Sequence, residues 1–410
     1  MVSSPQSLPG RATSHRKAIA QFEKLMHGFN VPCEVVLPGG EALRFGKDAP
    51  KFRLVVHNER VLARGLDEFG LGEAFVNGEW DVEGDMMSFF EIRHQLKQAI
   101  GALPWLKFWA QLLLMDPTHV NRKAIQHRYE FGADFFIPFM DQGYHLYSHG
   151  FFESDAETLE KGCERKMETA YKWVEAKPGM RVLDIGAGWG AVTRYFGPRG
   201  VHVTSLTLAN DSFGYISKLL KETGYPGQVL LEDYLVHQPE QPYDAIVILG
   251  VIEHIPYYRK FFQQAWKLLK PGGKIYMDAS ADIEKFGVSR FIRHYIYPGT
   301  HSYMCLQDVL QEQLFHGFMP LQVVEDNHNY SLTMKHWAQR FEIPANREMV
   351  RKRWGEQVYR SFWLYLWSGA YAFEHNVLQA YHLVAQRTEN PGPRPGLIRR
   401  ARHFVRQVTS

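Results

Sequence analysis

The sequence predicts an α/β protein whose main domain is a mainly parallel sheet with helices on both faces. Apolar strand candidates recur from residue 181 onward, with helix-compatible stretches between several of them. Each is a near-continuous apolar run, which is typical of strands buried in a parallel sheet. The first runs directly into a glycine-rich turn. The strand candidates are residues 182–185, 201–206, 229–231, 245–249 and 275–277.

The 410 residues are predicted to form four successive parts. Residues 1–20 contain no acidic residue and are expected to be a disordered N-terminus, with a mitochondrial-type leader as the alternative. Short alternating runs punctuated by glycines predict a small α+β domain at residues 21–115. Residues 116–390 contain the parallel sheet. Residues 391–410 form a basic tail, interpreted as solvated in preference to an anionic-membrane contact.

The composition excludes several functional classes. The net charge is only +3, from 47 basic and 44 acidic residues, so nothing predicts nucleic acid as a partner. Cys33, Cys163 and Cys305 are widely scattered, which favours a reducing compartment and predicts no metal site. The most apolar stretch, residues 102–115, is too short to span a bilayer, and a buried helix is preferred over an interfacial one.

The turn after the first strand carries the strongest sign of a ligand. Asp184 is followed by Gly186, Gly188 and Gly190, which let the backbone bend tightly and approach a ligand at the start of a helix. By itself this pattern fits a dinucleotide, S-adenosylmethionine or no ligand at all. The end of the second strand candidate is where a cofactor ribose would bind, and the end of the third offers a carboxylate and an aromatic ring for an adenine. These residues are Thr207 and Leu208, then Asp233 and Tyr234.

A second turn, Leu-Leu-Lys-Pro-Gly-Gly at residues 268–273, precedes the fifth strand candidate. Together the two turns resemble class I S-adenosylmethionine-dependent methyltransferases, which have a Rossmann-like sheet, whereas dinucleotide enzymes lack the second turn. Further motifs are similar to those of cyclopropane fatty acid synthases, over nearly the whole chain. They are residues 70–80, 129–152, 177–182 and 323–326, the Trp337-x-x-Arg-Phe element and Tyr365-Leu.

The resemblance implies methyl transfer from S-adenosylmethionine to the double bond of an unsaturated acyl chain on a membrane phospholipid. It also implies a cytoplasmic protein in peripheral contact with the inner membrane face, and a homodimer. The product is a cyclopropane or a methyl- or methylene-branched chain. The motifs carry over as cofactor-binding residues Tyr147, Ser148, Asp184, Gly186, Gly188, Gly190, Thr207, Leu208, Asp233, Tyr234 and Gly250.

Two departures from that family concern its bound bicarbonate, which acts as the base. Its ligands there are a cysteine, a glutamate, a histidine and a tyrosine. Glu253 and Tyr365 match the glutamate and the tyrosine, but His149 replaces the cysteine and Asp278 replaces the histidine. A carboxylate at this position disfavours bicarbonate by like-charge repulsion. Our hypothesis is that Asp278, alone or paired with His149, is the proton acceptor.

Several alternatives remain at this level. Asp278 could simply cap the turn after its strand, and His149 could be a packed ring. In the ribose region, Asp211 or Ser212 could provide the hydroxyl contacts. The chain as a whole could be a catalytically silent homologue that binds cofactor or lipid, or a methyltransferase acting on another alkene such as an isoprenoid. The intact glycine turn and the retained Glu253 and Tyr365 favour an active enzyme.

Overall fold

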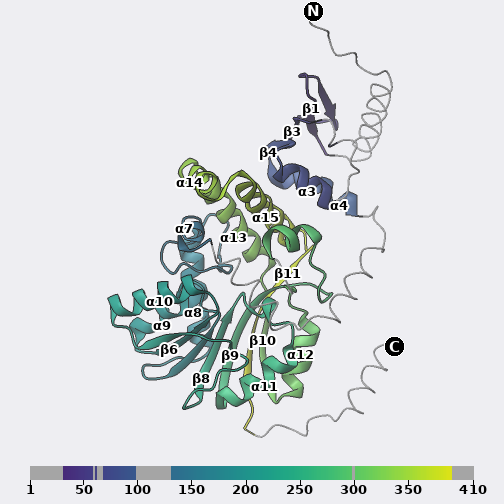
Figure 1. Cartoon of the computed structure of the whole chain (residues 1–410). Coiled ribbons are helices and arrows are strands. Elements are labelled where there is room, and N and C mark those ends of the chain that lie inside the picture. Colours follow the sequence, from purple (N-terminus) through teal and green to yellow (C-terminus); the bar gives the residue numbers. More distant parts are fainter. Residues whose placement is uncertain (1–30, 59–60, 62–67, 98–130, 298–300, 390–410) are drawn as a thin grey trace, which may run out of the picture. The chain divides into compact units, whose positions relative to one another are not determined.

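The computed structural model describes residues 31–58, 61, 68–97, 131–297 and 301–389 (Figure 1). The chain divides into two compact units. The first unit comprises residues 1–115, 290–296 and 347–371, and the second unit comprises residues 116–289, 297–346 and 372–410. The predicted N-terminus (1–20), the basic tail (391–410) and the apolar stretch (102–115) lie outside the described residues.

The first unit contains a four-stranded sheet in the order β2-β1-β3-β4, which confirms the small N-terminal sheet domain. β1 pairs with β2 antiparallel and with β3 parallel, and β3 pairs with β4 antiparallel. Cys33, Val35 and Phe52 are buried in one apolar cluster, whereas Glu34, between the first two, is paired with Arg44 and Arg53. The elements are β1 (Cys33–Val36), β2 (Ala42–Phe45), β3 (Phe52–Val56), α3 (Glu68–Val76), β4 (Trp80–Gly84) and α4 (Met86–Lys97).

The predicted boundary at residue 115 lies outside the described residues, and the first unit also includes two later segments that were predicted to belong to the methyltransferase domain. The reason is visible at α15 (Glu356–Glu374). The guanidinium of Arg360 donates to the carbonyls of Phe75 (2.5 Å) and Trp80 (2.7 Å) and pairs with Asp81 at 2.6 Å. This buried arginine therefore connects α15 to α3 and β4 through contacts that local sequence patterns do not predict.

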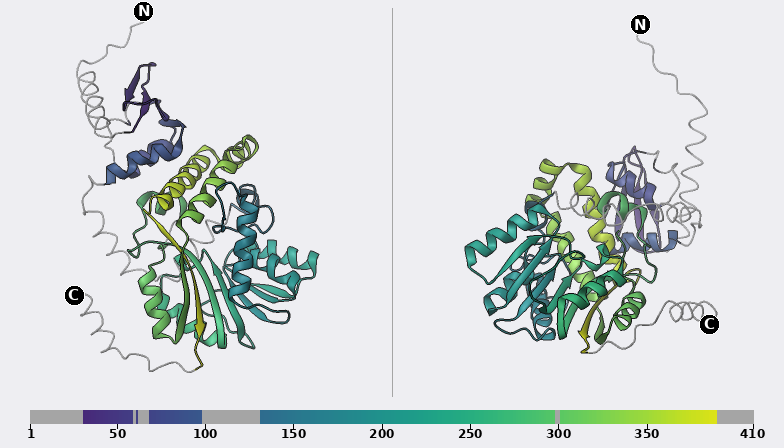
Figure 2. Two further views of the ribbon diagram at one scale, coloured as in Figure 1. Left: turned by 180° about the vertical axis from the view of Figure 1, so that it is seen from behind. Right: turned by 60° about the horizontal axis from the view of Figure 1, so that its bottom comes forward.

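The second unit is built on a seven-stranded sheet in the order β10-β11-β9-β8-β5-β6-β7, with helices on both faces (Figure 2). Its strands from β5 to β9 pair in parallel, whereas β11 pairs antiparallel with both β9 and β10. The predicted α/β class with a mainly parallel sheet is confirmed. The strands are β5 (Arg181–Ile185), β6 (His202–Thr207), β7 (Gly227–Leu231), β8 (Tyr243–Leu249), β9 (Leu269–Ala281), β10 (Phe318–Glu325) and β11 (Gln379–Arg387).

The helices of this unit follow the strands as predicted, with capping that explains some of their limits. The hydroxyl oxygen of Thr158 accepts from the backbone N–H of Lys161, which starts α8. Gly224, in the left-handed conformation, ends α10. The helices are α7 (Ala133–Phe136), α8 (Leu159–Trp173), α9 (Ala191–Phe196), α10 (Asn210–Thr223), α11 (Tyr258–Leu268), α12 (Leu306–Phe315), α13 (Asn327–Glu342) and α14 (Pro344–Trp354), the last continuing into the first unit.

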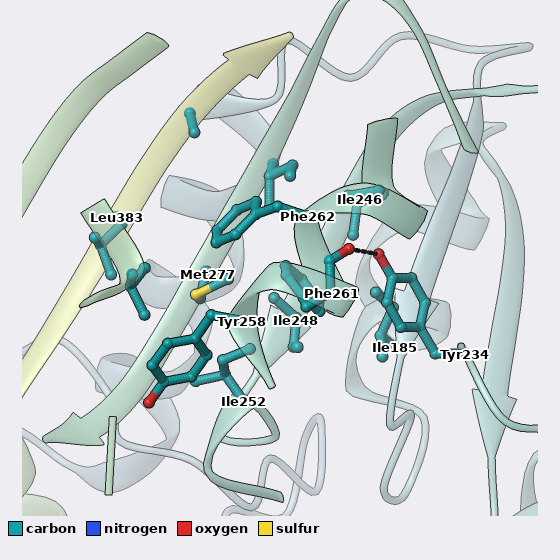
Figure 3. Packing of buried hydrophobic residues seen from close by; sticks show 14 of the residues in the cluster. Ile185, Tyr234, Ile246, Ile248, Ile252, Tyr258, Phe261, Phe262, Met277 and Leu383 are labelled. Carbon is teal, nitrogen blue, oxygen red and sulfur yellow. Dashed lines mark hydrogen bonds between the residues drawn. The ribbon is translucent and has the colours of Figure 1, made fainter. Parts of the chain in front are cut away.

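The strand β9 decides where the site lies, and it is longer than predicted. It continues to Ala281, so Asp278 lies inside the strand and does not cap the turn that follows it. Met277 packs into the apolar core formed with Phe262 and Leu383 (Figure 3). Because successive side chains of a strand point to opposite faces, Asp278 and Ser280 project from the other face. One face of β9 is thus apolar and the other carries buried polar groups.

Candidate active site

The glycine turn between β5 and α9 is shaped to admit a ligand. Gly186 and Gly188 both have left-handed backbones, with φ of +72° and +52°. A Cβ on Gly186 would lie 2.4 Å from Cγ2 of Val251, so packing requires the glycine there. A Cβ on Gly188 would meet nothing within 4 Å, so the space beside this residue is open. Gly190 is the N-cap of α9. A ligand can therefore approach the backbone at Gly188.

A buried carboxyl stands beside this turn at the end of β5. Asp184 is 3% exposed, and the hydroxyl of Ser205 donates to it at 3.0 Å. Burial raises the pKa of Asp184 to about 7. A cationic group of a ligand would restore the ionised form, and S-adenosylmethionine carries a sulfonium and an ammonium group. The turn and Asp184 therefore fit that cofactor.

After the end of β6, the structure bears on the alternative that Ser212 contacts the ribose hydroxyls. The hydroxyl of Ser212 donates to the carbonyl of Gly188 at 2.5 Å and holds the glycine turn, so it is not offered to a ribose. The hydroxyl oxygen of Thr207 accepts from the N–H of Ala209 at 3.1 Å. Leu208 is half-buried next to it. Leu208 and the exposed Asn210 and Asp211 are groups near the strand end that a ligand can reach.

The side chain of Tyr234 is turned into the core, and its contact with an adenine stays a prediction. Its ring is 4% exposed and packs against Phe261, with the centroids 5.0 Å apart (Figure 3). Its hydroxyl donates to the carbonyl of Phe261 at 2.9 Å. The side chain of Tyr234 points inward because Phe261 provides both an aromatic packing partner and a carbonyl acceptor. The neighbouring Asp233 is half-buried and accepts from the N–H of Leu235 at 2.8 Å.

Asp278 lies in a fully buried ionic cluster. Its Oδ2 is 2.7 Å from Nζ of Lys166 on α8, and neither side chain is exposed. Its Oδ1 accepts from the hydroxyl of Ser148 (2.7 Å) and from the N–H of Gly250 (3.0 Å). Lys166 also donates to the oxygen of Ser148 at 2.8 Å. An ammonium, a hydroxyl and an amide thus surround the carboxyl group of Asp278.

This cluster bears on two further predictions. The donors that could receive an external anion at this place already bind the carboxylate of Asp278. The residues present therefore do not fit a bound bicarbonate. Ser148 was predicted to contact the cofactor, but its hydroxyl is enclosed between Lys166 and Asp278. The side chain of Ser148 consequently orients protein groups and is not presented to a ligand.

Glu253 is the second buried carboxyl of the site, on the short helix η2 (Ile252–His254) after β8. Its Oε1 accepts from both the N–H and the hydroxyl of Ser280, each at 2.8 Å. Its Oε2 is buried and has no hydrogen-bond partner among the described residues. Burial, with the negative charge of Asp278 adding to it, raises the pKa of Glu253 to about 7. One oxygen is anchored and the other is available for chemistry.

His149 is paired with Asp326 and not with Asp278, which corrects the predicted pairing. Its Nε2 lies 3.2 Å from Oδ2 of Asp326, and the same oxygen lies 2.7 Å from Nδ1 of His382. Although burial alone would raise the pKa of Asp326, the hydrogen bonds from the two imidazoles hold it well below its usual range. Burial, followed by the charge of Lys166, lowers the pKa of His149. The His149 ring also stacks on Tyr330, with centroids 4.7 Å apart.

Two predicted residues remain to be placed. Tyr147 is half-buried, and its ring stacks on Trp337 with the centroids 5.2 Å apart and the planes 18° apart. Tyr365 lies on α15 within the first unit, so its catalytic role stays a prediction.

Among the described residues, no helix has the length and apolar character needed to cross a membrane.

Sequence reasoning missed Lys166, Asp326 and Tyr330. For Lys166 a signal existed, since it falls on the buried stripe of α8 with Cys163 and Ala170 at helical spacing. A lysine on such a stripe requires a buried partner. Neither Asp326 nor Tyr330 stands out locally, because what distinguishes each is the contact it makes with His149.

The parallel sheet, the open glycine turn with its buried carboxyl and the polar groups at the ends of β8 and β9 define a class I S-adenosylmethionine-dependent methyltransferase. Residues 117–383 match the family model described as "Mycolic acid cyclopropane synthetase". The chain belongs to that family, which confirms the resemblance to cyclopropane synthases.

Individual proteins of known identity agree with this assignment. The chain is 29% identical to the cyclopropane-fatty-acyl-phospholipid synthase of Escherichia coli strain K12, over 82% of this chain and 87% of that protein. It is 24% identical to a sphingolipid C9-methyltransferase of Candida albicans, over 78% of this chain and 66% of that protein. The solved structure of mycolic acid cyclopropane synthase CmaA1, complexed with SAH and CTAB, superimposes with a TM-score of 0.60 at 26% identity, covering 65% of this chain and 98% of that one.

Proposed function

We propose that this enzyme transfers a methyl group from S-adenosylmethionine to the double bond of an unsaturated acyl chain on a membrane phospholipid. The observation that carries the proposal is the buried polar cluster beside the cofactor turn. Glu253 and Asp278 are 3% and 0% exposed, and Gly186 of the turn packs against Val251, two residues before Glu253. The similarity to the Escherichia coli synthase supports this substrate class.

The site suits this reaction because an alkene is a weak nucleophile and its methylation generates a carbocation. The cofactor, when bound, supplies an electrophilic methyl group on a sulfonium. The task of the chain is to keep water away from the cation and to hold negative charge near it. His149, Glu253 and Asp278 are all buried, and two carboxyls face the same region. No side-chain nucleophile is needed for such a transfer.

The product follows from which proton leaves the cation. Loss of a proton from the new methyl group closes a cyclopropane, whereas loss from a neighbouring carbon gives a methyl-branched alkene. The similarity to a sphingolipid C9-methyltransferase favours the second product as a candidate alongside the first. We propose that either product forms without bicarbonate, since Asp278 occupies the donors of an anion site.

A lipid-analysis experiment tests the proposal directly. The chain is expressed in a host that makes unsaturated phospholipids, and the fatty acids are analysed by mass spectrometry before and after hydrogenation. We expect a gain of one methylene unit: a species that resists hydrogenation is a ring, and one that takes up hydrogen is branched. The matched control is Asp184→Asn, which keeps the shape of the side chain. If the protein without the substitution produces no new fatty acid, the proposal is rejected in favour of a silent homologue or another alkene substrate.

The location and assembly of the enzyme are further parts of the proposal. A peripheral protein at the inner face of the membrane would reach acyl chains without a spanning helix. We expect the purified protein to co-sediment with phospholipid vesicles and to elute as a homodimer. Failure to bind vesicles, or elution as a monomer at micromolar concentration, would contradict these two points separately.

A further inference from the structure

With no place for bicarbonate, the reaction needs a proton acceptor from the chain itself. We infer that Oε2 of Glu253 is this base, and that the ion pair between Lys166 and Asp278 is a fixed countercharge and not the acceptor. The inference rests on the proposed function. It differs from the simplest expectation from the sequence, in which Asp278 or His149 takes the proton.

The two carboxyls differ first in how their oxygens are used. Oδ1 of Asp278 accepts from the Ser148 hydroxyl at 2.7 Å and from the Gly250 amide at 3.0 Å, and Oδ2 forms an ion pair with Nζ of Lys166 at 2.7 Å. To accept a proton, Asp278 would have to give up part of this hydrogen bonding and leave a buried ammonium without its partner, which is costly. Glu253 has the opposite arrangement. Ser280 fixes Oε1 through two hydrogen bonds, and Oε2 is buried with no partner among the residues described.

Leaving a buried acceptor without a partner lowers the stability of the folded protein. A folded protein retains such a group where it serves a purpose, and an acceptor of a substrate proton needs a free lone pair. Two neighbouring carboxyls in different surroundings are a recurring sign of divided acid–base roles. Here Asp278 is paired with Lys166 at 2.7 Å, whereas burial together with the Asp278 charge raises the pKa of Glu253 to about 7.

His149 is the competing acceptor. Within the described part of the chain its buried Nδ1 has no hydrogen-bond partner, while its Nε2 lies 3.2 Å from Oδ2 of Asp326. However, burial and the positive charge of Lys166 lower the pKa of His149, so a protonated imidazole is disfavoured there. A carboxylate has a further advantage, because it attracts the carbocation before it takes the proton. These two effects favour Glu253.

The surroundings of Glu253 determine its proton affinity from several elements. Asp278 faces it from β9, Tyr258 from α11 and Tyr330 from α13, and the N–H of Ser302 donates to its backbone carbonyl at 2.9 Å. Burial raises the pKa of both tyrosines, so they are neutral phenols near pH 7. Asp278 is therefore the acidic neighbour whose charge raises the pKa of Glu253. The ring of His254, next to Glu253 in the chain, lies with its centroid 4.9 Å from that of His301.

The cofactor sulfonium, the alkene and Glu253 account for every bond, electron pair and proton of the reaction. A bond forms between the methyl carbon and one alkene carbon as the carbon–sulfur bond of the sulfonium breaks, and positive charge develops on the other alkene carbon. A C–H bond then breaks, and its electron pair closes the ring or forms the new double bond. The proton passes to Oε2 of Glu253, which becomes a neutral carboxylic acid, and it returns to solvent when the product leaves.

The experiment compares Glu253→Gln with His149→Phe in the full-length chain, using unsaturated phospholipid vesicles. For Glu253→Gln we expect kcat to fall about 10²–10⁴-fold, the range for loss of a general base. Cofactor affinity, measured by calorimetry, should change less than threefold. In the wild-type enzyme kcat should rise with pH through a midpoint near 7, because Glu253 must be ionised. The residual activity of Glu253→Gln should lack this rising limb, and His149→Phe should keep it.

The outcomes separate the inference from the function on which it rests. If the wild-type enzyme forms no methylated lipid, the proposed function fails. If the wild-type enzyme is active and Glu253→Gln retains the rising limb with more than a tenth of its kcat, Glu253 is not the base. Loss of the limb in His149→Phe instead would assign the role to His149. Cofactor affinity and the unfolding temperature of each variant report whether it has folded.

Discussion

The buried pair between Lys166 and Asp278 makes a prediction about stability that can be worked from the structure. The charged atoms are 2.7 Å apart and neither side chain is exposed to solvent. Replacing Lys166 with Met removes the ammonium and leaves an uncompensated carboxylate, and breaking a buried pair in this way costs about 3–5 kcal/mol. We expect Lys166→Met to lower the free energy of unfolding of the second unit by that amount.

A double-mutant cycle isolates the interaction. Asp278→Asn keeps an oxygen that can accept from Ser148 and from the Gly250 amide, so it removes mainly the charge. Combined with Lys166→Met, it should recover much of the lost stability, giving a coupling free energy of about 2–3 kcal/mol. The free energies come from urea unfolding followed by tryptophan fluorescence. If the two single effects add to within about 0.5 kcal/mol, the pair is not coupled and the reasoning fails.

An exposed ion pair on the same helix provides the control. Lys172 and Glu168 lie four residues apart on α8, and their side chains are 70% and 46% exposed. Water and salt already screen such a pair, so Lys172→Met should have no measurable effect on unfolding. An equal loss in both lysine variants would show that the effect comes from the helix and not from the buried charge.

Four further predictions follow from the site. Activity should be the same in CO₂-depleted buffer and with added bicarbonate, and stimulation by bicarbonate would refute the anion-site argument. Asp184→Asn should weaken cofactor binding about 10–100-fold by calorimetry, since a charge-assisted contact contributes about 1.5–3 kcal/mol; unchanged affinity would remove Asp184 from the cofactor site. Tyr234→Phe should lose about 1 kcal/mol of stability with its hydrogen bond to Phe261 and leave cofactor affinity unchanged, so a weakened affinity would support the predicted adenine contact. Glu253 has a pKa of about 7 in the folded protein and about 4.5 in the unfolded chain, so the free energy of unfolding should fall by about 3 kcal/mol as pH rises through that window. Glu253→Gln should lack that component of the pH dependence. Identical curves of stability against pH for the two proteins would contradict the raised pKa.

The residues of the fold that could be predicted are those whose signal is local. The parallel strands were visible as apolar runs, and the turn at Gly186 and Gly188 was visible because its conformation needs glycine. The limits of β9 were not, since its extension to Ala281 depends on pairing with β11, a strand about one hundred residues further along the chain. The same holds for α15, which groups with the first unit through the contacts of Arg360.

The candidate site shows the same division at the level of side chains. That Glu253, His149 and Asp278 belong to one site was predicted from motifs, and the structure places all three among buried groups of the second unit. Their partners were not predicted. Whether a carboxylate is a base or a fixed charge depends on the donors around it, and a sequence does not give those distances.

The sequence by itself determined the fold class, the family and the cofactor turn, because periodicity, glycine conformation and motif order are properties of neighbouring residues. Only the tertiary structure decided that Lys166 and Ser148 hold Asp278, that His149 turns to Asp326, and that Oε2 of Glu253 has no hydrogen-bond partner in the described part of the chain. The physical reason is that burial and charge act through space. Elements far apart in the chain bring Lys166 to within 2.7 Å of Asp278 and His149 to within 3.2 Å of Asp326.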